Sequence, residues 1–315
     1  MNRRDALQLL GLASIASLAP NSLAALASAG AQQAKPSPTM NPISLAQWSL
    51  HRRFGLCKAS EMPTTVADAM DFPKFAKSEF GISRVEYVNA FYRARIGEKT
   101  LGAELKKRCD DLGVSSVLIM CDGEGICGAA EEKSREEFAA NHEKWLALAK
   151  TLGCHSIRVN AIGEGTAEEQ TKRCADGLTK LLARAKPYGL GVIVENHGGL
   201  SSDGAWVVGV MKAVNDPMCG TLPDFGNWRD GSGVLHDPVR NVGLVTPYAK
   251  GMSAKSYDFN AAGDETVLDY PKIMEQVRAA KYTGAIGIEY EGKRLGEAEG
   301  IVATKKLLER LGCVA

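Results

Sequence analysis

The chain has 315 residues, of which 45% are hydrophobic and 24% charged, a composition typical of soluble globular proteins. Its formal net charge is only +1, so the sequence lacks the basic excess with which nucleic-acid-binding domains attract phosphate groups. We therefore expect no nucleic-acid partner.

The first residues have the order of a targeting signal. Arg3 and Arg4 precede a mildly apolar stretch, residues 6–19, and residues 27–29 (Ala-Ser-Ala) offer a small-residue cleavage site. This order resembles a twin-arginine export signal, although an amphipathic start with two unrelated arginines is the alternative. As a stable membrane span the segment is too short and too weakly apolar.

This interpretation divides the chain into three parts. We expect residues 1–34 to be the signal and cleavage region, residues 35–41 a linker, and residues 42–315 a single folded domain. The twin-arginine export machinery would then be a partner, and the protein would be exported folded to a periplasmic or other extracytoplasmic location.

After the linker, apolar runs typical of buried strands alternate with amphipathic runs typical of helices. The predicted strands are residues 43–49, 84–88, 116–121, 155–160, 192–194, 219–223, 251–255 and 285–288. The predicted helices are residues 66–80, 100–112, 134–152, 167–188, 204–214, 270–280 and 298–311. This alternation predicts an α/β fold, a (β/α)8 TIM barrel. An open doubly wound sheet is the alternative, but the first strand is not followed by a GxGxxG turn.

Several predicted strands end abruptly in polar residues. Glu195, Asp224 and Glu289 stand at the ends of the fifth, sixth and eighth strands. Because a barrel brings the carboxyl ends of its strands to one mouth, these carboxylates should lie close enough to share a divalent ion. Hard oxygen ligands suit manganese or magnesium, and one imidazole would tolerate zinc or cobalt.

Four of these stretches carry a family resemblance: VIVENHGG from Val192, LPDFGNW from Leu222, GMSAKSYDF from Gly251 and AIGIEYEG from Ala285. They resemble the sugar phosphate isomerase/epimerase superfamily of xylose isomerase-like barrels, over roughly residues 43–311. The resemblance implies one divalent metal (Mn, Mg, Co or Zn) and makes three carboxylates its ligands: Glu195, Asp224 and Glu289.

The sequence departs from the family pattern at the fourth ligand. The family's seventh strand commonly reads His-x-Lys, whereas this chain has Ser253 and Lys255, and Asn227 replaces a histidine usual near the sixth-strand aspartate. Three alternatives stay open. The metal has three protein ligands plus water, or His197 substitutes for the missing histidine, or Lys255 supplies the positive charge.

Isomerisation or epimerisation of a sugar needs a base that takes a proton next to a carbonyl, an acid, and a cation. The resemblance assigns proton transfer to Glu195 and Glu289, and Lys255 would stabilise an enediolate oxygen unless it only pairs with Glu289. Five residues are expected to bind substrate: His51, Arg158, His197, Asn227 and Trp228.

Other polar and aromatic residues near the strand ends have structural expectations. Six aromatic residues are expected around the mouth: Trp48, Phe91, Tyr92, Phe225, Trp228 and Tyr290. Glu291 is expected to face outward or to cap a loop. The eight cysteines contain no CxxC or zinc pattern, and Cys121 and Cys127 are the only close pair for which a disulfide stays open.

The leading hypothesis is an exported carbohydrate isomerase or epimerase that works through metal-assisted proton abstraction. One alternative is a lyase that uses the same base on an oxidised (3-keto) glycoside, and another is a non-catalytic sugar-binding barrel. A relative of apurinic endonucleases is disfavoured, because that zinc chemistry needs more histidines and a basic groove. The sequence leaves open whether the chain forms a homo-oligomer.

Overall fold

Eight short parallel strands form one sheet in the computed structural model, which describes residues 40–315. The expected export signal, residues 1–34, and most of the expected linker lie outside these residues. The strands are β1 (Ile43–Ala46), β2 (Arg84–Val88), β3 (Ser115–Met120), β4 (Ser156–Asn160), β5 (Gly191–Glu195), β6 (Cys219–Leu222), β7 (Ser253–Ser256) and β8 (Ile286–Tyr290).

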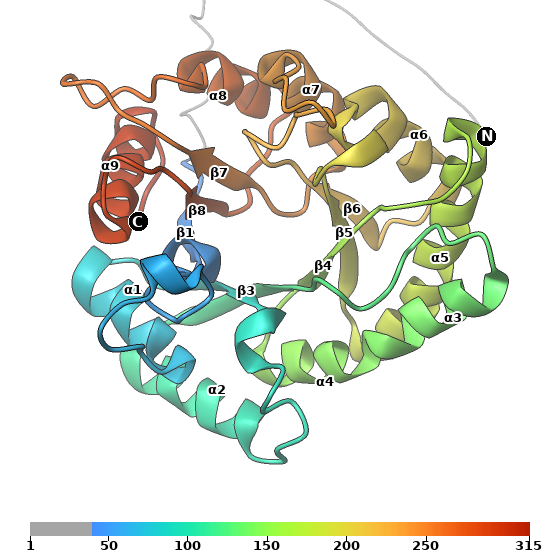
Figure 1. Cartoon of the computed structure of the whole chain (residues 1–315), viewed down its shortest axis with the longest axis horizontal. Coiled ribbons are helices and arrows are strands. Elements are labelled where there is room, and N and C mark those ends of the chain that lie inside the picture. Colours follow the sequence, from blue (N-terminus) through green and yellow to red (C-terminus); the bar gives the residue numbers. More distant parts are fainter. Residues whose placement is uncertain (1–39) are drawn as a thin grey trace, which may run out of the picture. The chain divides into compact units, whose positions relative to one another are not determined.

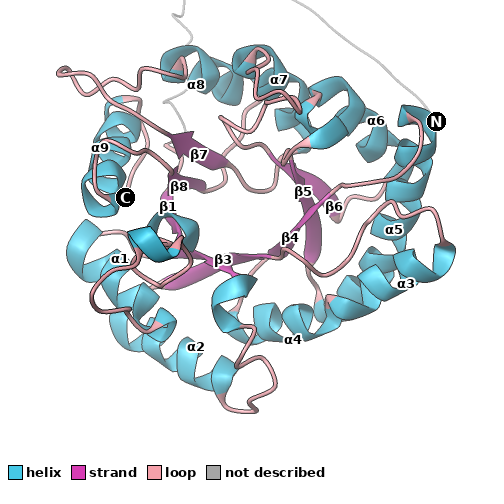
Figure 2. Cartoon of the chain, viewed as in Figure 1, coloured by secondary structure: helices cyan, strands magenta, loops and turns pink. Residues whose placement is uncertain are grey.

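Helices surround this sheet on the outside, as Figures 1 and 2 show. They are α1 (Phe72–Phe80), α2 (Leu101–Leu112), α3 (Glu132–Asn141), α4 (Glu143–Leu152), α5 (Ala167–Ala185), α6 (Gly204–Val214), α7 (Pro238–Val245), α8 (Tyr270–Ala279) and α9 (Glu297–Arg310). The predicted (β/α)8 barrel is therefore confirmed. Within residues 40–315, every helix is too short or too polar to cross a bilayer.

The sheet closes between β6 and β7. Seven strand pairs follow the order β6-β5-β4-β3-β2-β1-β8-β7, and two isolated parallel bridges, Thr221 with Ala249 and Asp224 with Ser253, join its two edges. The Phe225 amide donates to the Ser253 carbonyl at 3.0 Å, and the Ser253 amide donates to the Pro223 carbonyl at 3.0 Å. The ring of hydrogen bonds is thus completed at the carboxyl end of β6.

Alternation along the strands decides which side chains enter the barrel. On β5, Val192 and Val194 pack outward in the large core beneath the helices, whereas Ile193 belongs to a small apolar cluster with Leu118 and Leu222. Since successive strand residues point to opposite faces, Glu195 shares the inner face with Ile193. The apolar cluster forms the floor on which the polar strand ends stand.

Two predicted helices differ from the observed ones. The helix expected over residues 66–80 begins only at Phe72, because Asp68 caps a short 3-10 turn and a proline follows in the first helical turn. The helix expected over residues 134–152 is broken between α3 and α4. There the His142 ring nitrogen Nδ1 donates to the Phe138 carbonyl at 2.7 Å, while the His142 amide turns to Ala140 instead.

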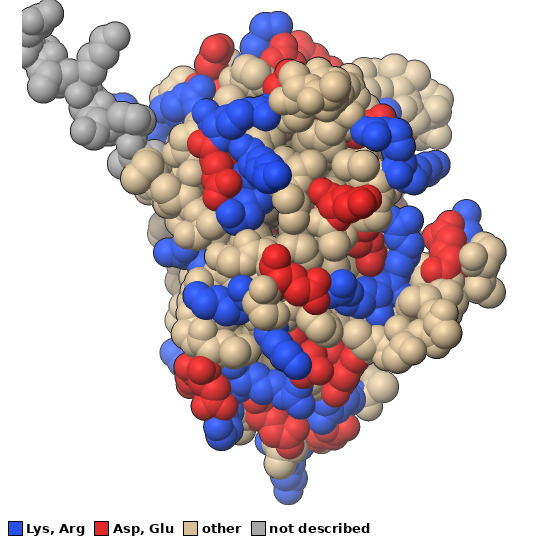
Figure 3. Space-filling view, turned by 90° about the vertical axis from the view of Figure 1, so that its left-hand side faces the viewer, with Lys and Arg blue, Asp and Glu red and all other residues tan. Residues whose placement is uncertain are grey.

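Acidic and basic side chains are interspersed on the face of the molecule shown in Figure 3. Many ionic side chains of residues 40–315 pair with a neighbour, as Arg53 does with Glu79 at 2.8 Å and Lys305 with Glu309 at 2.6 Å. Exposed pairs of this kind contribute little to stability but keep the surface free of large single-sign areas.

Candidate functional site

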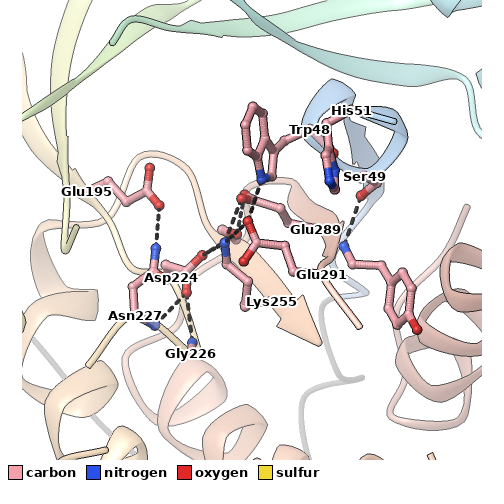
Figure 4. Close-up of polar contacts among 12 residues, drawn as sticks. Trp48, Ser49, His51, Glu195, Asp224, Gly226, Asn227, Lys255, Glu289 and Glu291 are labelled. Atoms are coloured by element: carbon pink, nitrogen blue, oxygen red, sulfur yellow. Dashed lines mark hydrogen bonds and ion pairs between the residues drawn. The ribbon is translucent and has the colours of Figure 1, made fainter. Parts of the chain in front are cut away.

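Three buried carboxylates from different strands meet inside the barrel mouth. Glu195 ends β5, Asp224 follows β6 by two residues, and Glu289 lies in β8. One ligand oxygen from each lies within 4.8 Å of the others, and each residue is at most 4% exposed. The fold therefore brings together three side chains of which the first and the last are 94 residues apart in the sequence (Figure 4).

Asp224 is held rigidly by the main chain around it. Its Oδ1 accepts hydrogen bonds from the amides of Gly226 at 2.7 Å and Asn227 at 2.9 Å. The Asn196 side chain also binds the Asp224 amide and carbonyl, at 2.8 and 3.1 Å. These contacts occupy Oδ1 and leave Oδ2 directed toward the strand-seven residues.

Ser253 and Lys255 occupy the inner face of β7 and contact the same carboxylates. The Ser253 hydroxyl lies 2.8 Å from Asp224 Oδ2 and 2.9 Å from Glu289 Oε2. The Lys255 ammonium lies 2.7 Å from Glu289 Oε1, 3.6 Å from Asp224 Oδ2 and 3.2 Å from Glu291 Oε1. A hydroxyl carries one proton, so Ser253 can donate to only one of its two neighbours at a time.

Arg158, on the inner face of β4, neutralises the other side of the site. Its Nη1 donates to Asp122 Oδ1 at 2.6 Å, and its Nε lies 2.7 Å from Glu195 Oε2. The Nε–H is not aligned with that oxygen, so neither atom has a hydrogen-bond partner and the contact is purely ionic. Asn227 Nδ2 donates to the other oxygen of Glu195 at 3.0 Å.

The three converging carboxylates have different surroundings, which shift their pKa values in different directions. Burial, together with the nearby Glu289 carboxylate, raises the pKa of Glu195 to about 7, and that of Asp224 also rises to about 7. Burial alone would also raise the pKa of Glu289, but Lys255, Arg158 and Ser253 together lower it below its ordinary value. Among the three converging carboxylates, Glu289 is thus the one whose pKa is lowered instead of raised.

The donor set fits a hard divalent cation. Five carboxylates (Glu195, Asp224, Glu289, Glu291 and Asp122) face only two cations, Arg158 and Lys255. Three of these carboxylates, Glu195, Asp224 and Glu289, are buried, and buried negative charge without enough cationic partners is costly. Three converging carboxylate oxygens without a histidine suit magnesium or manganese better than zinc.

A cavity of about 790 Å³ opens above these carboxylates. Of the residues expected at the site, Arg158, His197 and Glu289 line the cavity, and Asp122 and Asn160 lie beside them. Glu195, Asp224 and Lys255 lie beneath this lining, joined to it through Glu289 and Arg158.

Three residues expected to bind substrate do not line the cavity. Trp228 is fully buried, and its indole nitrogen has no hydrogen-bond partner. Asn227 is turned toward Glu195, and His51 stacks on Trp48 at 4.9 Å while its Nδ1 donates to the Trp48 carbonyl. In the structure Asn227 and His51 thus contact neighbouring side chains and lie outside the cavity lining, and their expected role in substrate binding stays a prediction.

Only one of the six aromatic residues expected around the mouth lines the cavity. Of the six, only Trp48 lines the cavity, while Tyr92, Phe225, Trp228 and Tyr290 are buried. Phe225 packs edge-on against Tyr270 at 5.4 Å, so it belongs to the core beneath the helices. Aromatic character alone did not distinguish residues that face the mouth from those that face outward.

The expectation for Glu291 was wrong. Instead of facing outward, its carboxylate lines the cavity, pairs with Lys255 and accepts a hydrogen bond from the Trp48 indole (Figure 4). A signal was present in the sequence, because residues two apart on a strand point the same way and Glu289 was already assigned inward. The open question of a Cys121–Cys127 disulfide is also resolved, since all eight cysteines are unpaired.

Comparison with known proteins gives a consistent picture. Residues 75–311 match the family model described as "Xylose isomerase-like TIM barrel". No curated protein matches the sequence.

Many solved structures share the fold at low identity. A 3-keto-D-glucoside 4-epimerase from E. coli superposes with a TM-score of 0.65 at 15% identity, covering 86% of this chain and 99% of that one. The IOLI protein, solved with a bound zinc atom, has a TM-score of 0.65 at 13% identity and covers 84% and 95%. A xylose isomerase-like TIM barrel protein from Mycobacterium smegmatis, in complex with magnesium, has a TM-score of 0.63 at 18% identity and covers 86% and 96%.

Proposed function

Since this chain belongs to the xylose isomerase-like TIM barrel family, we propose that it is a carbohydrate isomerase or epimerase that moves a proton next to a carbonyl. The observation that supports this proposal most directly is the convergence of Glu195, Asp224 and Glu289 beneath a cavity of about 790 Å³. Carboxylates in unlike environments provide both a base and an acid at one site.

Glu195, Asp224 and Glu289 would hold one divalent cation, with magnesium or manganese favoured by the oxygen ligands. When bound, this ion would supply positive charge where negative charge develops during proton abstraction. It would also offset the carboxylates that Arg158 and Lys255 leave unpaired.

The two glutamates would divide the proton transfers between them. Lys255, 2.7 Å away, lowers the pKa of Glu289 against the effect of burial, so its carboxylate would take the proton from carbon. Glu195, whose pKa is raised to about 7 by burial, can hold a proton and return it from the other side. Arg158 and His197 line the cavity and would orient the substrate's hydroxyl groups.

Metal content tests this proposal. The purified protein, Glu195→Gln and Asp224→Asn should be compared by mass spectrometry after incubation with Mn²⁺ and removal of the unbound ion. We expect about one ion in the parent protein and a large loss in both variants. Glu86→Gln is the matched control, because Glu86 is equally buried in the barrel but is not one of the three ligands. Unchanged metal in both variants would remove the proposed ligand set.

A lyase that acts on oxidised glycosides is the second candidate. The fold similarity to a 3-keto-D-glucoside 4-epimerase favours it, because the same base that removes a proton next to a ring carbonyl can also drive elimination. Incubation with a 3-keto glycoside separates the two, since a lyase releases the aglycone and an epimerase leaves it attached. Tight sugar binding without turnover of any compound would instead support a non-catalytic barrel.

We also propose that residues 1–34 direct export of the folded protein by the twin-arginine route. Arg3-Arg4 and the small-residue site at residues 27–29 support this proposal. Fractionation of cells that express the parent chain or the Arg3→Lys, Arg4→Lys double variant tests it. We expect the parent in the extracytoplasmic fraction and the double variant inside the cell, and an identical distribution would contradict export by this route.

A further inference from the structure

The cavity above the carboxylates is lined by side chains of two chemical kinds. The polar ones include Arg158, Glu289 and Glu291. The apolar ones are Trp48, Leu56, Val88, Ala90 and Ile162, and these five residues are called the apolar wall below. Cavities of about 300–1,000 Å³ typically hold drug-sized ligands, and this one, at about 790 Å³, is in the upper part of that range. A single sugar ring is smaller than such ligands and would leave the apolar wall uncovered.

Two side chains of the apolar wall are exposed to solvent. Leu56, in the segment before α1, is 36% exposed, and Ile162, between β4 and α5, is 46% exposed. They come from loops more than 100 residues apart in the sequence, yet both line the same cavity. Large exposed apolar side chains gathered at a concave site mark a surface that a ligand covers.

Trp48 contacts both a polar and an apolar part of the lining, because it bonds Glu291 and packs against the cluster that contains Val88. Its indole nitrogen donates to Glu291, and the ring stacks on His51 with an interplanar angle of 16°, so the indole is held in one orientation (Figure 4). The indole edge therefore touches the acidic cluster while the ring contributes to the apolar wall. A ligand that covers Trp48 therefore meets an acidic group and an apolar surface at the same residue.

We propose that the substrate is a sugar that carries an apolar, ring-sized substituent, bound with the sugar over Glu289 and Glu291 and the substituent against Trp48, Leu56 and Ile162. This inference rests on the proposed function, because it takes the carboxylates as the place where the sugar reacts. If the substituent is joined through a glycosidic bond, that bond blocks the anomeric carbonyl. The carbonyl next to the abstracted proton must then stand on another ring carbon, which is a further reason to test oxidised glycosides.

Calorimetry with matched ligand pairs tests the inference. The probes are phenyl and methyl glycosides of D-glucose, D-galactose and D-xylose, with phenol as a third ligand, measured on the Mn²⁺-loaded protein. We expect at least one phenyl glycoside to bind on the order of tenfold or more tightly than its methyl partner, because the phenyl ring buries apolar surface. In a Leu56→Ser, Ile162→Ser double variant this ratio should fall to about threefold or less, while affinity for the methyl glycoside stays unchanged.

Val234→Ser is the control variant, since Val234 is 55% exposed and does not line the cavity. Its affinity ratio should equal that of the parent. Equal binding of phenyl and methyl glycosides, a ratio that survives the double substitution, or phenol binding as tight as that of the phenyl glycoside would each overturn the inference. If the protein turns over an unsubstituted sugar and binds phenyl and methyl glycosides equally, only the inference about the substituent fails. If the parent protein does not bind metal at Glu195, Asp224 and Glu289, the proposed function itself fails.

Discussion

The Lys255 ammonium nitrogen lies 2.7 Å from Oε1 of Glu289, and both residues are at most 4% exposed. The lysine thus supplies positive charge among carboxylates that a divalent ion would also bind. Its removal should change stability and metal binding in opposite directions.

Lys255→Met keeps the length of the side chain but removes its charge. We expect the metal-free protein to lose on the order of 3 kcal/mol of unfolding free energy, because Glu289 is left buried without its cationic partner. Mn²⁺ should bind this variant more tightly than the parent, since no ammonium then repels the ion. Thermal unfolding with and without Mn²⁺ measures both effects, and the stabilisation by the metal should be larger in the variant.

Lys58→Met is the control for this experiment, because Lys58 is an exposed lysine that lines the same cavity. We expect neither its stability nor its response to Mn²⁺ to differ from the parent. A smaller Mn²⁺-induced shift in Lys255→Met than in the parent would show that the lysine does not compete with the ion.

Glu86 should make stability depend on pH. Burial raises its pKa to about 8; its Oε1 accepts from Ser44 at 2.5 Å, and its Oε2 has no partner. An acid whose pKa is higher in the folded state binds more protons there, so its contribution is fully present below about pH 4.5 and is lost as pH rises toward 8. That contribution is on the order of 5 kcal/mol, since each pKa unit corresponds to about 1.4 kcal/mol.

Glu86→Gln replaces this acid with a neutral group of the same size. We expect the unfolding free energy of the variant to fall less between pH 5 and pH 8 than that of the parent. Chemical denaturation at several pH values measures the two slopes. Parallel slopes would mean that Glu86 ionises in the folded protein as it does in the unfolded chain.

Gly287 leaves room for the Glu86 side chain. A Cβ atom at Gly287 would lie 2.5 Å from Glu86 Oε2 and 2.7 Å from its Oε1, and the Glu86 side chain is fully buried inside the barrel. We expect Gly287→Ala to lower the unfolding free energy by about 1–3 kcal/mol through overpacking. The control is Gly209→Ala in α6, where no atom lies within 4 Å and alanine should stabilise the helix by a few tenths of a kcal/mol or more. Equal melting temperatures for both variants would contradict this account.

The cysteines should react as separate thiols. All eight are unpaired, and Cys57 is the only one among them that is not buried. We expect a thiol reagent to modify one group rapidly in the folded protein and eight after denaturation without reductant. If fewer than eight thiols react in the denatured protein, a disulfide is present. If several thiols react rapidly in the folded protein, the regions that bury these cysteines unfold locally and often.

The barrel and its acidic triad could be predicted because they follow from local pattern and topology. Each apolar run that ends in a carboxylate gives a strand, and closure of the ring brings Glu195, Asp224 and Glu289 to one mouth whatever the loops do. That these three carboxylates bind a metal ion stays a prediction, which the metal-content experiment tests.

Where a helix breaks, and which aromatic residue lines the cavity, could not be predicted, because each depends on the contacts of a single side chain in the folded protein. The helix over residues 134–152 has helical periodicity throughout, and it breaks because the His142 ring takes the Phe138 carbonyl from the main chain. Likewise Trp48 and Phe225 are both aromatic residues next to strand ends, and only the three-dimensional packing decides that one lines the cavity and the other is core.

In the ring, β8 lies between β1 and β7, so the strand made last among the eight pairs with the one made first. Glu289 arrives on that strand, more than 90 residues after Glu195. During synthesis a nascent chain that already contains five or six strands therefore has neither a closed cylinder nor a complete set of acids. Binding of the proposed ion would therefore follow the synthesis of β8, the same strand that completes the barrel.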